Sequence, residues 1–461
     1  MNRLGLLIAF CCMFALGRAG AAEVKLPDFQ TITLDNGATL LLTPRKDVPL
    51  IATTVLVRGG SLADPAGKEG VAELTAGMLE KGAGDRNAAA FAEAVDNAGG
   101  SLSLSSTSEA VVANAQFLSK DSTLMLSLLS DALQHPRMDA AEFDKLRKNA
   151  IDSIATAKDS DPRRLVGTYA DAWLFQNHPY GRAENETSLA NITLQDLQEF
   201  RRLHMGGNRL IISIAGDFDS AAITHQVQQL FGHWAAATGT LPTVEAKQPE
   251  KGRRVLLVDK PGATQTYFSL LNVGTTRSDP ARAAQNLVQT AFGGRFTSML
   301  NTELRVKSGL TYGATSRINR MRLPGDVNLT SFTKTETTQA AIDLAIATLD
   351  KLHQTGLDAA TLQSAKNYIA GQFPPSLETS AQVASSIAWL TMFDEPRSSI
   401  DGYLSSVEAA TPAQVAAARA IYPQSKDLVI VAIGDASAIR PIMQKYGPVT
   451  EIKLSDPRFS P

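Results

Sequence analysis

Cysteine is almost absent from this sequence of 461 residues, and its absence excludes several chemistries. The two cysteines are the adjacent Cys11 and Cys12. Residues 13–461 therefore offer no disulfide, no thiol nucleophile and no cysteine ligand for a metal. With 44% apolar residues, the chain is long enough for two or more domains whose stability rests on hydrophobic cores alone.

Histidine is also scarce, and its spacing excludes the common one-helix zinc site. The sequence contains six histidines: His135, His178, His204, His225, His233 and His353. No two of them stand three to five residues apart, so no helix can present a histidine pair to one zinc ion. Serine-hydrolase, phosphate-loop and dinucleotide-binding motifs are missing too. A zinc site assembled from distant histidines stays open as an alternative.

Neither sign of charge predominates along the chain. Lysine and arginine together number 44, against 46 aspartates and glutamates. Removal of residues 1–22 would take away Arg3 and Arg18 and no acid, which leaves 42 against 46, a net charge of −4. This balance argues against a nucleic-acid partner and against an anionic membrane surface.

Long hydrophobic runs are missing except near the N-terminus. Arg3 is followed by the apolar run Leu4–Leu16 and by the small residues Ala19–Ala22. These three parts predict a secretory signal peptide over residues 1–22, because the run is too short to span a membrane comfortably. The expected location is periplasmic or secreted, with no membrane association after cleavage. A retained anchor is the alternative.

The sequence is internally duplicated. In each half an apolar run leads to an Asp-Pro pair, and Asp64 and Asp279 lie 279 − 64 = 215 residues apart. A second run ends in Gly-Asp, and Asp217 and Asp435 lie 435 − 217 = 218 residues apart. Two ordered matches at nearly one offset indicate gene duplication; independent strand-turn pairs are the alternative. The matched runs are Ile51–Val57 with Tyr267–Val273, and Leu210–Ala215 with Leu428–Ile433.

The order of elements predicts the fold class of both halves. Each half is predicted to run strand, helix, strand pair, long helices and final strand, which favours an α+β fold with an antiparallel or mixed sheet backed by helices. Residues 235–254 combine proline, glycine and mixed charges, as is typical of a linker. The predicted domains are therefore residues 23–234 and 255–461.

Residues 70–80 are predicted to form a helix with one apolar face. Its other face carries Glu73, Ala76, Gly77 and Glu80. With the preceding Val57-Arg58-Gly59-Gly60-Ser61, this segment resembles the zinc-site segment of the M16 peptidases, the family of insulinase and the mitochondrial processing peptidase. The resemblance implies the metallohydrolase fold of that peptidase, in which two homologous halves form half of a clamshell.

The same resemblance implies that the zinc site of the N-terminal domain is degenerate. The family places His-x-x-Glu-His on this helix, where two histidines bind zinc and the glutamate polarises water. The matching positions are Glu73, Ala76 and Gly77, and the third ligand, a later glutamate, falls on Ser153. No cofactor is therefore expected in this chain. Glu73 is predicted to be a solvated carboxylate, with binding of basic peptide side chains as the alternative.

A second segment, Gly293–Gly313, resembles the second-half signature of the family. There an arginine and a tyrosine seven residues apart reach across to the metal site, and Arg305 and Tyr312 have that spacing. The resemblance implies a catalytic role, because a guanidinium and a phenol can donate to the oxyanion that forms during hydrolysis. Gly293 and Gly294 are implied to help hold the peptide.

The resemblance therefore implies a non-zinc-binding subunit of a heterodimeric M16 metallopeptidase. A homologous subunit with an intact His-x-x-Glu-His would hold the zinc, and extended or unfolded peptides would be the substrates, because sheet edges capture backbone by strand addition. The alternative is a non-catalytic protein that binds peptides or serves as a scaffold. A self-sufficient hydrolase with a different site has no support in the sequence.

Overall fold

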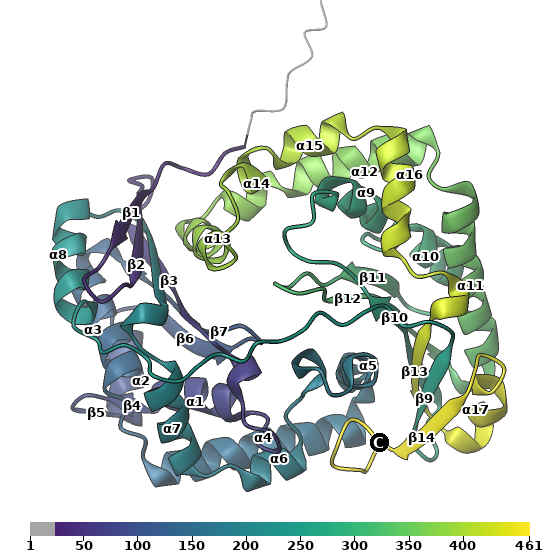
Figure 1. The fold of residues 1–461 in the computed structure, drawn as a ribbon, viewed down its shortest axis with the longest axis horizontal. Coiled ribbons are helices and arrows are strands. Elements are labelled where there is room, and N and C mark those ends of the chain that lie inside the picture. The colour runs from purple at the N-terminus through teal and green to yellow at the C-terminus, as the bar shows by residue number, and fades with distance from the viewer. Residues whose placement is uncertain (1–23) are drawn as a thin grey trace, which may run out of the picture.

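The computed structural model describes residues 24–461 and contains a six-stranded sheet in each half of the chain (Figure 1). The predicted signal peptide lies outside the described residues. The first sheet consists of β1 (Gln30–Thr33), β2 (Thr39–Pro44), β3 (Leu50–Arg58), β6 (Ser101–Ser106), β7 (Ala110–Leu118) and β8 (Leu210–Gly216). The second consists of β9 (Arg254–Asp259), β10 (Gln265–Val273), β11 (Ala314–Ile318), β12 (Asp326–Lys334), β13 (Val429–Gly434) and β14 (Val449–Lys453). A small hairpin pairs β4 (Gly82–Ala83) with β5 (Arg86–Asn87).

The two sheets share one topology, which confirms the predicted α+β fold of two homologous halves. The first has the order β1-β2-β8-β3-β7-β6 and the second, written from its other end, β14-β9-β13-β10-β12-β11. In both sheets the corresponding inner pair is parallel (β2 with β8, β9 with β13), and the central strand β3 or β10 is antiparallel to its neighbours. The outer pairs differ in direction, since β14 runs parallel to β9 whereas β1 runs antiparallel to β2. The duplicated runs found in the sequence occupy the matching strands β3 and β10, and β8 and β13.

Helices cover both sheets. In the first half these are α1 (Val71–Leu79), α2 (Ala88–Asn97), α3 (Ser122–Gln134), α4 (Ala140–Ser160), α5 (Val166–Phe175), α6 (Glu186–Asn191), α7 (Leu194–His204) and α8 (Ser220–Phe231). In the second half they are α9 (Arg282–Phe292), α10 (Met299–Asn301), α11 (Thr338–Thr355), α12 (Ala359–Gln372), α13 (Ser380–Met392), α14 (Ser398–Asp401), α15 (Tyr403–Ala409), α16 (Pro412–Ala418) and α17 (Ala436–Met443). Within residues 24–461, no helix has the length and apolar character needed to cross a bilayer.

One helix from each half packs against the sheet of the other half (Figure 1). Helix α13 packs on β3 and β8, and α5 packs on β10 and β13. Strand β3 is consequently buried on both faces: Val55 and Val57 join the core beneath α1 and α3, whereas Leu56 packs in the cluster that contains Ile387 of α13. Burial on both faces explains why residues 51–57 of this strand are apolar apart from Thr53 and Thr54.

The segments near the two ends of the chain also contact the opposite half. Near the N-terminus, the Leu26 amide donates to Asp401 of α14 over 2.8 Å. Near the C-terminus, Phe459 packs edge-on against Tyr169 of α5, with ring centroids 4.9 Å apart. Residues 235–253, in the predicted linker, contain no helix or strand. The two halves are thus joined by exchanged helices and terminal segments as well as by the linker.

Candidate functional site

The face of α1 that was predicted to be a degenerate zinc site offers no histidine. Ala76 is fully buried. A Cβ atom built on Gly77 would lie 2.9 Å from Cδ2 of Leu146, which approaches from α4. A larger side chain at position 77 would therefore have to displace Leu146. Ser153 is exposed and lies two helical turns beyond Leu146 on the same face of α4, where its hydroxyl has no hydrogen-bond partner among the described residues.

Glu73 is exposed, and its carboxylate also makes a contact that the sequence did not predict. Its Oε2 atom accepts a hydrogen bond from the Ser106 amide over 2.7 Å. Two helical turns further along, at the C-terminal end of α1, Glu80 accepts from the Leu104 amide. Leu104 and Ser106 are two residues apart on β6, so their amides point to the same side of the strand. Because β6 is the last strand of the first sheet, the two glutamates cover its free edge.

This covered edge has a physical reason. An edge strand exposes unpaired amide groups that invite pairing with another chain, and proteins block such edges in several ways. Here two carboxylates serve as the acceptors that a neighbouring strand would otherwise supply. Burial raises the pKa of Glu73 and of Glu80, while the bonds from the β6 amides act in the opposite direction. The Glu73 side chain thus covers part of the edge of the first sheet. The helix periodicity of the sequence does not predict this contact.

An acidic cavity of about 500 Å³ lies beside Glu73. Its lining includes Asp64, Glu69 and Glu184, together with Arg182. Asp64 accepts the amides of Gly70 and Ala72 over 2.8 Å each and so holds the start of α1. Burial raises the pKa of Asp64 to about 7, although these two hydrogen bonds act to lower it. Burial and, second, the charge of Glu73 raise the pKa of Glu184 to about 7 as well.

The carboxyl groups that line this cavity come from distant parts of the chain. Among residues 24–461, no cluster of three or more His, Cys, Asp or Glu side chains has a geometry that could hold a metal ion. Sequence reasoning missed Glu184 completely, since it stands more than 100 residues after Glu73 in a loop before α6. Asp64 was visible only as part of the repeated Asp-Pro pair.

Arg305 and Tyr312 lie at the surface of the second half. Arg305 belongs to a single π-helical turn, Thr302–Lys307, and its guanidinium stacks 4.9 Å from the ring centroid of Phe296. Such turns are rare and often occur at functional sites. Tyr312 is 81% exposed and Phe296 is 60% exposed. The loop that carries Tyr312 is held to this turn by the amide of Leu310, which donates to the Leu304 carbonyl over 2.9 Å.

The two glycines of the second signature differ in their surroundings. Gly293 is buried, and its carbonyl accepts the Ser316 amide of the edge strand β11 over 3.0 Å. A Cβ on Gly293 would lie 2.5 Å from the Ser316 nitrogen, so only glycine permits this approach. Gly294 is exposed. The carbonyl of Gly293 is therefore already used within the fold, and Gly294 is the one that remains accessible to a peptide.

Models of two protein families match most of the chain. Residues 42–187 match insulinase (peptidase family M16), and residues 191–369 match the peptidase M16 inactive domain. An uncharacterized zinc protease of Mycobacterium bovis is 26% identical over 392 residues, which cover 83% of this chain and 88% of the relative.

Two solved structures have a similar fold. One is the peptidase M16 inactive domain from Pseudomonas fluorescens, with a TM-score of 0.82 and 23% identity over 88% of this chain and 98% of that one. The other is a protease from Helicobacter pylori, with a TM-score of 0.82 and 20% identity over 89% of this chain and all of that one. At these identities the likeness concerns the fold.

Proposed function

Since this chain belongs to the M16 peptidase family, we propose that it is the zinc-free subunit of a two-chain M16 metallopeptidase. One observation carries the proposal: the first half has lost the donors of the zinc helix, whereas the second half presents Arg305 and Tyr312 at its surface. Leu146 packs against Gly77 where a histidine side chain would be needed. The remaining donors can act only on a substrate held elsewhere.

The partner is a homologous M16 chain that carries His-x-x-Glu-His and binds the zinc. Arg305 and Tyr312 of this chain donate to the scissile carbonyl oxygen as it becomes negatively charged. The geometry is compatible with that role, because the Arg305 guanidinium makes no ion pair in the described structure and the Tyr312 hydroxyl has no partner there. Both groups are therefore available to a second chain and its substrate.

The substrates are extended or unfolded peptides, and the enzyme works in the periplasm or outside the cell. The predicted signal peptide supports export, and the cysteine-free sequence after residue 12 suits a compartment in which thiols are oxidised. The carboxylates that cover β6 limit strand addition at that edge of the first sheet. Peptide contacts by this chain are accordingly assigned to the second half, around Arg305, Tyr312 and Gly294.

The test is peptide cleavage by an equimolar mixture of the mature chain and its His-x-x-Glu-His partner. Arg305→Ala and Tyr312→Phe are each expected to lower kcat by about 10²- to 10³-fold, the usual cost of removing an oxyanion donor. Arg317→Ala and Tyr368→Phe remove the same groups from surface positions on β11 and α12 and should leave the rate unchanged.

Cleavage by the partner that neither rises when this chain is added nor falls with the Arg305 and Tyr312 variants would contradict the proposal. In that case, the non-catalytic peptide-binding or scaffolding role becomes the better account. Analytical ultracentrifugation of the same mixture then distinguishes a scaffold, which would associate with the partner without changing the rate, from a peptide-binding protein that does not associate with it.

A further inference from the structure

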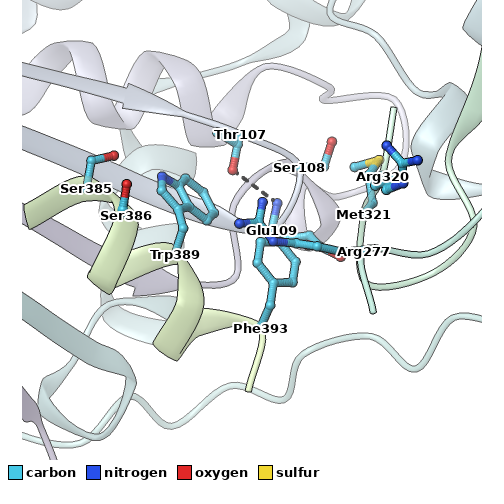
Figure 2. Close-up of a pocket in the computed structure, with 10 residues that line it drawn as sticks. All are labelled: Thr107, Ser108, Glu109, Arg277, Arg320, Met321, Ser385, Ser386, Trp389 and Phe393. Carbon is cyan, nitrogen blue, oxygen red and sulfur yellow. Dashed lines mark hydrogen bonds between the residues drawn. The ribbon is translucent and has the colours of Figure 1, made fainter. Parts of the chain in front are cut away.

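A cavity of about 390 Å³ lies where the two halves meet (Figure 2), next to the acidic cavity at α1, with which it shares Thr107 and Ser108. Three parts of the chain form its walls. Thr107, Ser108 and Glu109 come from the turn between β6 and β7; Arg277, Arg320 and Met321 come from loops of the second half; Ser385, Ser386, Trp389 and Phe393 come from α13 and its end. Figure 2 shows the two serines and Trp389 along one wall, with Arg320 and Met321 opposite them.

Arg320 is a half-buried cation with an unused donor. Its Nη2 donates to Gln285 over 2.9 Å, but its Nε is buried and has no acceptor within residues 24–461. Burial, reinforced by the charge of Arg282, lowers the pKa of Arg320 to about 10, so the group still carries its charge at neutral pH. A buried donor without an acceptor is costly and requires a partner or an ordered water molecule.

Arg277 adds a second cation that is only partly neutralised. Its Nε pairs with the buried carboxylate of Glu395 over 2.6 Å, and Arg282 shares the same carboxylate over 3.3 Å. The Arg277 guanidinium stacks 4.7 Å from the ring centroid of Phe393. Its two terminal nitrogens have no acceptor among the described residues. Stacking and the single ion pair thus fix the orientation of Arg277 and leave two donors available.

The remaining walls suit an apolar body with a polar end. Trp389 stacks on Phe393 with ring centroids 5.7 Å apart, and both rings line the cavity. The one acidic residue in the lining, Glu109, is already engaged: its Oε1 accepts from the Tyr180 hydroxyl over 2.8 Å and from the Arg322 amide over 3.2 Å. The hydroxyls of Ser385 and Ser386 supply further hydrogen-bonding groups.

From this arrangement, we infer that the cavity binds a carboxylate attached to an apolar or aromatic body, with the carboxylate at Arg320 and Arg277 and the body against Trp389. Planar guanidinium donors match the two oxygens of a carboxylate. The assignment of that carboxylate to a peptide, as a C-terminus or an acidic side chain, rests on the proposed function. The binding itself needs neither zinc nor a second subunit.

Titration calorimetry of the mature chain alone tests this inference. N-acetylphenylalanine should bind at least about tenfold more tightly than N-acetylphenylalaninamide, because only the former has the carboxylate. Arg320→Gln should reduce the affinity for the acid to that for the amide, whereas Arg317→Gln, which removes an exposed arginine from β11, should change neither. Ser386→Leu, which fills the cavity, should abolish both and tests the site even if Arg320→Gln fails to fold.

The same measurement identifies the source of the carboxylate. Acetyl-Glu-Phe-amide has only a side-chain carboxylate, so tight binding of this probe assigns the site to acidic side chains, and weak binding assigns it to C-termini. Equal affinity for the acid and the amide, or affinity for the acid that Arg320→Gln does not lower, would overturn the inference. Since no cleavage is measured, this result is independent of whether the chain acts as a peptidase subunit.

Discussion

At the scale of single residues, α1 lies beside a cluster of carboxyl groups whose pKa values are raised by burial. Glu73, Ala76 and Gly77 could be located from the sequence, because they lie on one helix with the family's spacing. The residues that now surround them could not. Leu146 and Glu184 reach α1 from segments about 70 and 110 residues further along the chain, and only the tertiary fold brings them there.

Glu184 is expected to make stability depend on pH. Its pKa is raised from an ordinary 4.5 to about 7 by burial and, second, by Glu73. The folded protein therefore holds this proton more tightly than the unfolded chain, and the resulting stabilisation is complete below pH 4.5 and is lost as the pH rises to about 7. Glu184→Gln should remove this loss and make the variant more stable than the wild type by about 3 kcal/mol above pH 7.

Urea denaturation at a series of pH values measures this difference. Asp64, whose pKa is also raised to about 7, remains in the variant and keeps part of the pH dependence. Glu93→Gln, at an exposed position on α2, is the matched control and should follow the wild type. A Glu184→Gln curve parallel to that of the wild type between pH 4.5 and 8 would show that Glu184 is solvated in the folded protein.

At the scale of elements, the contact between α1 and β6 shows where sequence patterns stop being informative. The strands and the amphipathic α1 could be predicted, since both depend on local periodicity. The covering of a strand edge by Glu73 and Glu80 depends on which strand lies last in the sheet, and that order is set by long-range pairing. Both glutamates would otherwise count as ordinary surface residues of a helix.

Removal of these two acceptors should expose the edge of β6. In the double variant Glu73→Ala, Glu80→Ala, the amides of Leu104 and Ser106 lose their partners. Their hydrogen exchange should become at least about tenfold faster, since a hydrogen bond to a charged group contributes about 1.5–3 kcal/mol. Glu73→Gln retains an acceptor oxygen and should keep Ser106 protected. Unchanged exchange of residues 101–106 in the double variant would mean that the carboxylates do not protect the edge.

At the scale of the whole molecule, the two halves are held together by helices and terminal segments that pack against the opposite half. The duplication, and with it the repeated sheet, could be predicted because the two copies retain matching strands. The packing of α5 and α13 against the opposite sheets could not be predicted. A helix that packs on the opposite half has the same sequence periodicity as a helix that packs on its own half. Lys158 of α4 makes one of the contacts that join the two halves. It pairs with Glu186 over 2.6 Å and donates to the Asp456 carbonyl over 2.7 Å.

Lys158→Ala should therefore destabilise the entire protein. The Lys158 side chain is 8% exposed, and its loss leaves the Glu186 carboxylate unpaired and the segment around Asp456 unanchored. Breaking one partner of a buried ion pair costs about 3–5 kcal/mol. Lys148→Ala removes an exposed pair with Asp152 on the same helix and should cost less than about 1 kcal/mol. Equal denaturation midpoints for the two variants would contradict a role for Lys158 in joining the halves.

The proposal that this chain acts only with a zinc-bearing partner is tested most directly by the metal content and peptidase activity of the purified mature chain alone. Incubation with zinc, followed by dialysis and elemental analysis, should leave no bound zinc, and unfolded peptides should remain intact. This result is expected because α1 offers Glu73, Ala76 and Gly77 in place of a ligand set. Stoichiometric zinc together with peptide cleavage that a chelator abolishes would contradict the account.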